Sequence, residues 1–439
     1  MTRRGLWIGL AALAAAACAA GAAPAQPDPR TIDYVVRPGD TLSGLATRYL
    51  LRPADYRAVQ DLNAVREPRR MPHGLVLRIP VRLLRTSPAV ARVVNFRGAV
   101  TVTRNGRPVE AAVGLEVGEG AVVATGANAF VRLALPDGGH VSLPSRSRVR
   151  IARLRTVLLT GATDQAFQVE AGRTETQAAP VAPSGGFTIG TPMSVSAVRG
   201  TEFRVAYDPQ GNRSATEVLE GTVAVEAGGK AILARAAEAV SVDATGAALT
   251  SLLPAPELRR PDDVQSAETV SFDLSPTPGA ALYRARLATD AGMTDAFAET
   301  ESPAGGPVVF ADLADGAYFV RLTAVAPDGV EGRPSVYSFI RARNGLGALG
   351  SSAVGQGRDR RYLFRWEAAG AGEARFRFQL RLADATGPPM IDEAGLTEPR
   401  ITLTGLPPGV YEWRVRATRQ AFGRTLETWS PPQQLRIGR

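Results

Sequence analysis

Two stretches near the start of the chain decide the fold of its first module. Residues 34–46 read YVVRPGDTLSGLA, and residues 74–80 read GLVLRIP. Each contains the alternation of apolar and polar residues that is typical of a short strand, and the first is broken by Pro38-Gly39, a turn-forming pair. Asp40 or Thr41 then caps a helix, because both side chains accept hydrogen bonds from the first amides of a helix. The pattern predicts a strand, a turn and a helix, and later a second strand.

The segment between these strands has helical periodicity. Apolar residues recur there at the spacing of one helix face. They are Leu42, Leu45, Ala46 and Tyr49 in a first helix, and Tyr56, Val59 and Leu62 in a second helix predicted over residues 54–63. We expect both sets to point inward. The order strand, helix, helix, strand predicts a compact βααβ unit over residues 32–81.

This unit resembles the LysM domain, the module that bacteria use to hold peptidoglycan and chitin-like glycans. The matching residues are Tyr34, Val36, Gly39-Asp40-Thr41-Leu42, Ala46, Tyr49, Leu62-Asn63, Gly74, Leu77 and Ile79-Pro80. The resemblance spans the whole module. The sequence departs from the family over residues 69–73, which read RRMPH where a plainer Pro-Gly turn is common.

The resemblance implies a shallow groove for glycan between the loop after the first strand and the loop before the last. In this sequence those loops supply the candidate site residues Gly39, Asp40, Thr41, Leu42, Asn63, Met71 and Pro72. Backbone amides and short polar side chains suit the N-acetyl groups of a sugar, and Gly39 lets the chain approach closely. An alternative is that Gly39, Asp40 and Thr41 act only as turn and cap, and the two roles are compatible. Peptidoglycan is the expected partner.

The composition of the whole chain is that of a mainly β protein. A length of 439 residues predicts two to four domains. Glycine (45) and proline (32) are abundant and aromatic residues make up 6%, which favours short strands joined by turns over long helices. The formal net charge is +9, and all basic residues except Lys230 are arginines, which we interpret as a bias of the genome's base composition. No stripe of basic and aromatic residues of the kind that binds nucleic acid is present.

Basic residues are concentrated in the first module. Residues 31–90 carry ten arginines (37, 48, 52, 57, 66, 69, 70, 78, 82 and 85) against five acids (33, 40, 55, 61 and 67). Such an excess helps a module to approach an anionic wall or membrane surface. The alternative is an ordinary solvated surface.

The first 25 residues have the features of a secretory signal peptide. Arg3-Arg4 precede an apolar run over residues 6–17, which is too short and too rich in alanine to remain as a transmembrane helix. Ala23-Pro24-Ala25 offers a cleavage site. Cys18 is the single cysteine and an alternative site of lipoprotein anchoring, although Ala15 stands where a larger aliphatic residue is usual. After cleavage we expect no disulfide, no transmembrane span, and a location in the periplasm or cell envelope.

The sequence pattern of the second module, over residues 90–250, predicts β-strands throughout. Three phrases together resemble a FecR domain: GAV at 98–100 with RNG at 104–106, LALPDG at 133–138, and TP at 191–192 followed by VRGTEF at 198–203. The resemblance implies an all-β domain, sheet-stacked or solenoid-like, in the cell envelope. In the founding role of the family, this domain senses an outer-membrane receptor and controls a sigma factor. That role needs a cytoplasmic helical segment and a transmembrane helix, whereas this chain has a leader and the βααβ unit, which argues against direct sigma-factor signalling.

We give the segment from Arg199 to Phe203 a structural interpretation. Gly200 permits a bulge or close backbone packing. Arg199 is expected to pair with Glu202 or Glu220, while Phe203 and Val205 are expected to fill the core.

The C-terminal part of the chain repeats itself after a linker at residues 254–263. Residues 312–322 (DLADGAYFVRL) parallel residues 405–415 (GLPPGVYEWRV), and a Gly- and Ser-rich linker is expected at 344–357. A period of about 90 residues with alternating strands predicts two β-sandwiches, over 264–343 and 358–438. They look like fibronectin type III domains, and the Leu-x-x-Gly-x-Tyr pattern resembles the buried tyrosine at a strand corner in that family. Trp366, Trp413 and Trp429 are expected to be packing residues rather than sugar platforms.

Residue patterns of known enzyme sites are missing from the sequence. His73 and His140 are the two histidines and do not form a zinc site with carboxylates at the usual spacing. There is no G-x-S-x-G and no P-loop. Asp262-Asp263 lies in a linker, whereas a glycosidase needs two acids across a cleft. We therefore expect no catalytic residues, no metal and no cofactor.

The sequence thus predicts a multidomain, mainly β protein: a signal peptide (1–25), a small βααβ LysM module (32–81), an all-β FecR-like domain (90–250) and two C-terminal β-sandwiches (264–343 and 358–438). We expect a non-enzymatic cell-envelope protein that binds peptidoglycan, a glycan containing N-acetylglucosamine, and presents β domains to protein partners. Two alternatives stay open: a periplasmic FecR-like sensor or regulatory module localised by the LysM, and a surface adhesin component.

Overall fold

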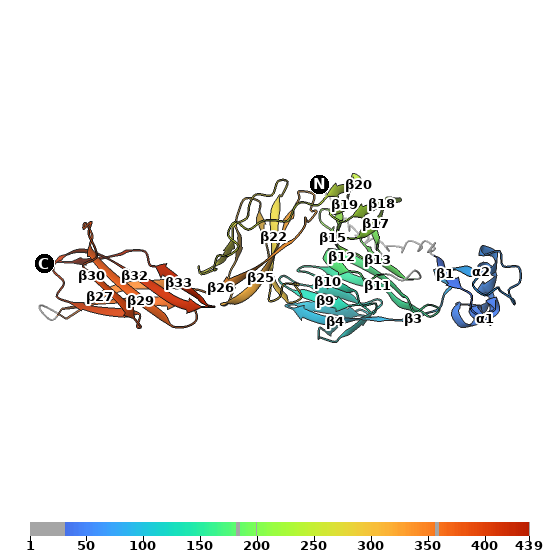
Figure 1. The fold of residues 1–439 in the computed structure, drawn as a ribbon, viewed down its shortest axis with the longest axis horizontal. Coiled ribbons are helices and arrows are strands. Elements are labelled where there is room, and N and C mark those ends of the chain that lie inside the picture. Colours follow the sequence, from blue (N-terminus) through green and yellow to red (C-terminus); the bar gives the residue numbers. More distant parts are fainter. Residues whose placement is uncertain (1–30, 181–184, 199, 356–359, 439) are drawn as a thin grey trace, which may run out of the picture. The chain divides into compact units, whose positions relative to one another are not determined.

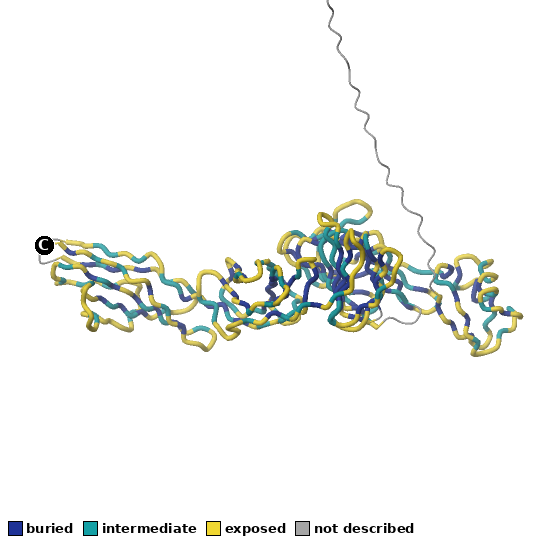
Figure 2. Tube along the Cα trace, turned by 90° about the horizontal axis from the view of Figure 1, so that it is seen from above, coloured by how far each residue is buried: buried dark blue, intermediate teal, exposed yellow. Residues whose placement is uncertain are grey.

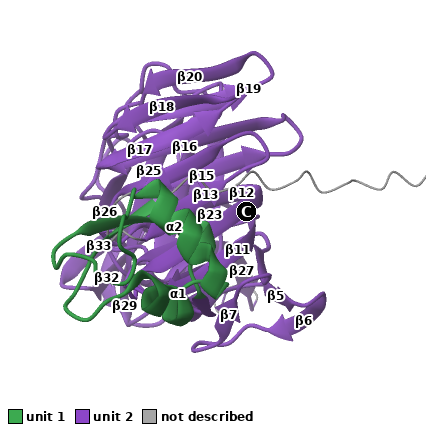
Figure 3. Ribbon diagram, turned by 90° about the vertical axis from the view of Figure 1, so that its right-hand side faces the viewer, with its two compact units in different colours: residues 1–85 green, residues 86–439 purple. Residues whose placement is uncertain are grey.

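The structure is a computed structural model that describes residues 31–438 except 181–184, 199 and 356–359. The expected signal peptide and Cys18 lie outside the described residues. The chain forms two compact units, residues 1–85 and 86–439 (Figure 3). The expectation of a multidomain, mainly β protein with a small βααβ unit at its N-terminal end is confirmed (Figure 1).

The first unit has the expected order strand, helix, helix, strand. Its elements are β1 (Thr31–Val35), α1 (Leu42–Tyr49), the 3-10 turn η1 (Pro53–Asp55), α2 (Tyr56–Leu62), β2 (Val76–Pro80) and the 3-10 turn η2 (Val81–Leu83). Strands β1 and β2 are antiparallel, with Tyr34 opposite Leu77. Thr41 rather than Asp40 caps α1, because the amide of Gly44 donates to Thr41 Oγ1 over 3.0 Å.

The core of the first unit is small and is made by both strands and both helices. Ile32 and Leu77 come from the sheet, Leu45 from α1 and Val59 from α2, and all four are buried. The inward position expected for Leu62 is wrong, because its side chain is 39% exposed. Leu62 is the last residue of α2, and the helix is anchored to the core one turn earlier, by Val59.

The next segment of the chain forms a closed barrel of strands β3 to β20. The strands, which run from cyan to yellow-green in Figure 1, are β3 (Thr86–Pro88), β4 (Val90–Arg97), β5 (Val100–Arg104), β6 (Arg107–Glu110), β7 (Glu116–Gly118), β8 (Val122–Thr125), β9 (Phe130–Ala134), β10 (His140–Leu143), β11 (Arg148–Val157), β12 (Thr163–Gln177), β13 (Gly186–Gly190), β14 (Val195–Val198), β15 (Glu202–Asp208), β16 (Arg213–Glu220), β17 (Thr222–Ala227), β18 (Lys230–Arg235), β19 (Glu238–Asp243) and β20 (Gly246–Ser251).

Strand β12 joins the two faces of the barrel. Its first half pairs with β11 and β13, and its second half pairs with β15. Gly172 stands where the pairing changes, with φ +76°, and a Cβ there would lie 2.3 Å from the carbonyl oxygen of Arg146. Because no side chain fits at that distance, this crossing between the two faces requires glycine.

Apolar side chains from both faces fill the barrel. The buried positions of the chain are dark blue in Figure 2. Phe187 contacts Phe167 and Phe203, with ring centroids 5.8 and 6.3 Å apart. The core positions expected for Phe203 and Val205 are confirmed, since both are fully buried. Gly200 has φ +72°, and a Cβ there would lie 3.1 Å from Pro180 Cα, so the expected close packing is also present. The pairing expected for Arg199 falls outside the described residues.

Two β-sandwiches follow the barrel, as predicted. The first sandwich contains β21 (Val270–Phe272), β22 (Leu282–Ala288), β23 (Ala296–Pro303), β24 (Val308–Phe310), β25 (Gly316–Val325) and β26 (Ser335–Arg341). The second sandwich contains β27 (Gly345–Val354), β28 (Arg361–Ala369), β29 (Ala374–Leu382), β30 (Ile391–Leu396), β31 (Arg400–Thr404), β32 (Gly409–Ala421), β33 (Arg424–Trp429) and β34 (Gln433–Ile437). Each has two sheets around its own core.

The linker expected over residues 344–357 is largely a strand. Residues 345–354 form β27, which pairs along its length with β28. Glycine and serine lower the intrinsic preference for a strand, but hydrogen bonding to a neighbouring strand overrides that preference. The second sandwich therefore begins earlier than predicted.

The aromatic residues of the repeat differ in role. Tyr411 is buried, and its hydroxyl donates to the carbonyl of Pro407 over 2.7 Å, as expected for a tyrosine at a strand corner. Trp366 and Trp413 are core residues, 3% and 1% exposed. Trp429 is 37% exposed, and the guanidinium of Arg414 lies 4.3 Å from its ring centroid. Trp429 therefore packs at the surface, against cations.

Candidate functional site

Two loops of the first unit lie side by side and carry the candidate glycan site. The turn after β1 is closed by the amide of Asp40, which donates to the carbonyl of Arg37 over 3.1 Å. The amide of Leu42 donates to the carbonyl of Pro68 over 2.8 Å, and this bond ties the first loop to the second. The second loop then turns back, with the amide of Leu75 donating to the carbonyl of Pro72. The predicted site residues Gly39 to Leu42 and Met71-Pro72 thus come from loops that contact each other.

Asp40 organises the first loop from within. Its Oδ2 accepts hydrogen bonds from the Tyr34 hydroxyl (2.7 Å) and from the amide of Arg37 (2.9 Å), and its Oδ1 pairs with Arg48 (3.2 Å). Burial pushes the pKa of Asp40 upward, but the hydrogen bonds and the cation outweigh it and hold that pKa below its usual value of 3.8. Burial and the bond to Asp40 raise the pKa of Tyr34 to about 12. Asp40 is therefore a fixed anion at neutral pH.

The other predicted polar residues are also engaged within the fold. Thr41 accepts the capping bond from Gly44. The Asn63 side chain donates to the carbonyls of Val59 (2.7 Å) and Arg78 (2.8 Å) and accepts from the amide of Arg78 (2.7 Å), so it extends the β2 edge. A ligand at these positions meets side chains that already have partners.

The remaining predicted residues differ in what they present. The Leu42 side chain is 1% exposed and its amide is bonded to Pro68, so it supports the loop from inside. Gly39 and Pro72 are exposed, and Met71 is half-buried. Gly39 has φ +85°, and a Cβ built there would meet nothing within 4 Å. Its backbone is therefore open to solvent on the side where a side chain would stand.

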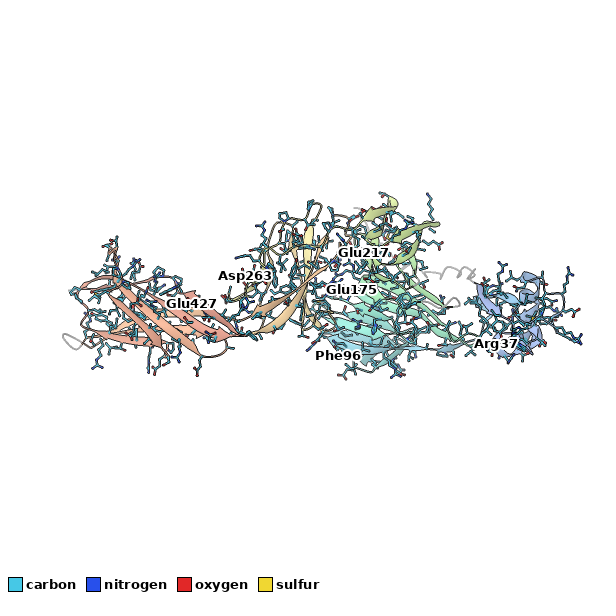
Figure 4. The ribbon with its side chains drawn as sticks, viewed as in Figure 1. Arg37, Phe96, Glu175, Glu217, Asp263 and Glu427 are labelled. Carbon is cyan, nitrogen blue, oxygen red and sulfur yellow. The ribbon has the colours of Figure 1, made fainter. Side chains whose placement is uncertain are left out.

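Tyr34 and Arg48 were not predicted as site residues, although both hold Asp40 in place. The signal for Tyr34 lies in the alternation of β1, which points its ring inward and leaves its hydroxyl next to the Pro38-Gly39 turn. Arg37, Arg69 and Arg70 are exposed on the two loops. Arg37 is labelled in Figure 4.

The first unit, which has the expected order of elements, the Leu42–Pro68 bond and the half-buried Asp40, also matches a family model. Residues 34–80 match the model described as LysM domain. The segment is a LysM domain. Residues 121–224, within the barrel, match the model described as FecR protein. The LysM and FecR matches follow each other in the expected order, and the two β-sandwiches come after them. The families matched are binding and regulatory domains typical of envelope proteins.

Comparison with solved structures gives weaker likenesses. Two structures of a candidate anti-sigma factor from Parabacteroides distasonis share 17% and 18% identity, cover 30% of this chain and have a TM-score of 0.26. This chain spans 59% of the length of that protein. A two-domain fibronectin type III segment of chicken tenascin is 14% identical, covers 43% of this chain and 100% of its own length, and has a TM-score of 0.25. None of the curated protein sequences matches this chain.

The part of the chain that the structure describes holds neither a candidate metal cluster nor a candidate membrane-spanning helix. In that part, no group of three or more His, Cys, Asp or Glu side chains is arranged to hold a metal ion. Neither of its α-helices has the length and apolar character that crossing a bilayer requires.

Proposed function

We propose that this chain is a non-enzymatic protein of the periplasm or cell envelope, which binds peptidoglycan through its LysM domain and presents its β domains to protein partners. The observation that carries the proposal is the LysM match over residues 34–80, together with the hydrogen bond that sets the two candidate loops side by side. Export by the leader at residues 1–25 belongs to the same proposal, with lipid anchoring through Cys18 as its alternative.

Within the candidate site the residues have different roles. Gly39, Met71 and Pro72 offer backbone and apolar surface to the N-acetylglucosamine units of the glycan. Asp40, Thr41, Leu42 and Asn63 shape the two loops, because their polar groups or side chains are held within the domain. Recognition therefore depends mainly on backbone groups held in fixed positions, so that little freedom is lost on binding.

Sedimentation with purified insoluble peptidoglycan tests the site. The change Gly39→Asn places a side chain over the open face of the first loop, and asparagine tolerates a positive φ. We expect the fraction of protein that sediments to fall several-fold. Gly106→Asn is the matched control, since Gly106 lies in a hairpin of the barrel with φ +75° and open space around it.

Two results would contradict the proposal. Equal sedimentation of Gly39→Asn and the parent protein would show that the glycan site does not include the first loop. Equal sedimentation of the parent protein and a chain that lacks residues 31–85 would show that the LysM domain is not responsible for binding peptidoglycan.

A second candidate function is a periplasmic sensor or regulatory module, which the FecR match over residues 121–224 favours. In that case the LysM domain only localises the chain, and a membrane protein of the envelope binds the barrel. Chemical crosslinking in cells would identify that protein, and its capture should survive Gly39→Asn. The third possibility, an adhesin component, requires that protease added to intact cells removes the two sandwiches.

A further inference from the structure

A buried cluster of charged side chains joins the barrel to the first sandwich. The barrel contributes Arg173 and Glu175 from β12, Arg204 from β15 and Glu217 from β16, and the sandwich contributes Arg284 and Arg286 from β22, Glu299 from β23, Arg321 from β25 and Glu331 from the turn after β25. We call these residues the ionic cluster. Each of their side chains is at most 18% exposed.

Ion pairs of the cluster cross directly between the two domains. Glu175 of the barrel pairs with Arg286 and with Arg321 of the sandwich, at 2.9 Å each. Arg204 Nη1 lies 3.1 Å from Glu331 Oε1, and Arg204 Nη2 donates to the Glu331 carbonyl oxygen over 2.6 Å. Arg173 pairs with Glu331 over 3.2 Å. Opening of the contact breaks these pairs, so water must solvate the charges that are released.

Apolar and polar contacts between the two domains lie beside the cluster. Val330 of the sandwich packs with Ala215 of β16, and Ala288 packs with Phe130 of β9. At the rim, Arg97 of β4 pairs with Asp295 over 2.7 Å. The cluster is therefore enclosed by contacts on more than one side.

Glu217 is the carboxylate of the cluster that has the poorest charge partner. Its side chain is 2% exposed, and the nearest cation is Arg204, with Nε 3.6 Å from Glu217 Oε2. The amide of Glu331 donates to Glu217 Oε1 over 3.1 Å. Glu331 itself takes the closer contacts, with Arg173, Arg204 and Arg284. Figure 4 labels Glu217 and Glu175 on the barrel.

The surroundings of Glu217 favour its protonated form. On β15 it faces Arg204, from the sandwich it faces Glu331 and Arg284, and on β19 its ladder partner is the uncharged Ala239. Burial, reinforced by the Glu331 carboxylate, raises the pKa of Glu217 from 4.5 to about 7 despite Arg204. Once the two domains separate, water reaches Glu217 and its pKa returns toward the ordinary value.

We propose that the contact between the barrel and the first sandwich is a pH-responsive joint, which takes up a proton at Glu217 when it closes and releases that proton when it opens. The closed state then binds more protons than the open state between about pH 4.5 and pH 7. Closure is therefore favoured at mildly acidic pH and weakened as the pH rises toward 7 and above. A first sandwich that comes free at higher pH would uncover the charged face of β12, β15 and β16 for another protein.

Other titrating groups near the joint either titrate in a different pH range from Glu217 or affect closure in the opposite direction. Despite burial, the arginines of the cluster lower the pKa of Glu175, to about 2, and that of Glu331, so both matter only in stronger acid. Burial and Arg132 lower the pKa of His140, so its effect on closure would run opposite to that of Glu217. A loss of closure on raising the pH therefore identifies Glu217 rather than His140.

Thiol labelling of the whole chain measures how often the joint opens. Ala215→Cys, in a chain that also carries Cys18→Ser, places a thiol in the apolar cluster that holds Val330, at a position 5% exposed, so opening of the joint should make it more accessible to a reagent. Val113→Cys, at a position 67% exposed, supplies the rate for a free thiol at each pH. The labelling rate of Val113→Cys divided by that of Ala215→Cys gives the protection of the joint at each pH. The pH dependence of thiol ionisation cancels in this ratio.

We expect protection at Ala215→Cys to fall by ten-fold or more between pH 5.5 and pH 8. The upper limit is roughly 300-fold, set by a shift in pKa from 4.5 to about 7. Glu217→Gln should abolish most of this dependence, whereas His140→Asn should retain it. Protection that does not change with pH, or an equal dependence in Glu217→Gln, would overturn the proposal. Ala288→Cys, under Phe130 on the other side of the joint, provides the same measurement if Ala215→Cys does not fold.

Discussion

The hydroxyl of Tyr34 donates a 2.7 Å hydrogen bond to Asp40 Oδ2 and so closes the loop that bears the candidate glycan site. Tyr34 belongs to β1 and is nearly buried, whereas Asp40 stands just before α1. The bond therefore couples the position of the loop to the core of the LysM domain. Residues that do not themselves contact glycan can in this way decide whether the loop is ready to bind it.

The change Tyr34→Phe should lower both the stability and the wall binding of the LysM domain. It keeps the ring in the core and removes a hydrogen bond to a charged acceptor, a loss of about 1.5–3 kcal/mol in the free energy of unfolding. Thermal unfolding and sedimentation with peptidoglycan measure the two effects. Tyr49→Phe is the control, since Tyr49 is half-buried and stacks with Arg48. Equal unfolding temperatures for Tyr34→Phe and the parent would show that the bond contributes nothing.

Stability of the LysM domain should fall in acid because of Asp40. The pKa of Asp40 is depressed in the folded domain, so its contribution is fully present above its unfolded value of 3.8 and is lost as the pH falls through the folded pKa. Unfolding by denaturant at pH 7 and at successively lower pH below 4 measures this. Asp40→Asn should be less stable at pH 7 and should lose less on acidification. A parallel acid loss in both proteins would assign the effect to other carboxyl groups.

Salt should weaken binding to the wall if the exposed arginines of the two loops face anionic groups there. Sedimentation of the parent protein should then fall several-fold between about 50 mM and 500 mM salt, because screening shortens the range of these attractions. The double change Arg69→Ala and Arg70→Ala should flatten this dependence. Arg82→Ala with Arg85→Ala, at positions outside the two loops, is the matched control. Binding that is insensitive to salt would indicate an ordinary solvated surface.

Gly172→Ala should destabilise the barrel strongly. The new Cβ would lie 2.3 Å from the carbonyl oxygen of Arg146, at a φ of +76° that alanine adopts at a cost. We expect a loss of about 3 kcal/mol or more in the free energy of unfolding, within the range of severe single changes. Gly106→Ala has a similar φ and open space, so it reports the cost of the backbone conformation alone. Similar unfolding temperatures for the two variants would show that β12 adjusts without cost.

The parts of this protein that were predictable from sequence are those set by local patterns. The alternation around Tyr34 and the turn at Pro38-Gly39 specify β1 and the start of α1 with no long-range information. The same holds for Phe203 and Trp413, whose alternating neighbours indicate a buried face. The choice between Asp40 and Thr41 as helix cap was not predictable, because both residue types suit the position and Tyr34 decides between them.

The errors arose where distant segments decide the outcome. Residues 345–354 have the composition of a linker, but they form β27 because their backbone pairs with the neighbouring strand β28. Leu62 has helical spacing, but α2 ends there. The ionic cluster gave no signal in the sequence, because charged residues that alternate along a strand usually face water. Arg204 and Glu331 are brought together only by the docking of two domains.

The ionic cluster also limits how this protein can be divided. A fragment that ends after β20 keeps the strands of the barrel and loses the sandwich's half of every ion pair between the two domains. Its exposed face would then carry Arg173, Glu175, Arg204 and Glu217, and of the ion pairs described above they would keep only the contact between Arg204 and Glu217. A gene rearrangement that passed the barrel to another protein would face the same problem. We therefore expect the barrel and the first sandwich to be inherited together as one unit, although they fold as two domains.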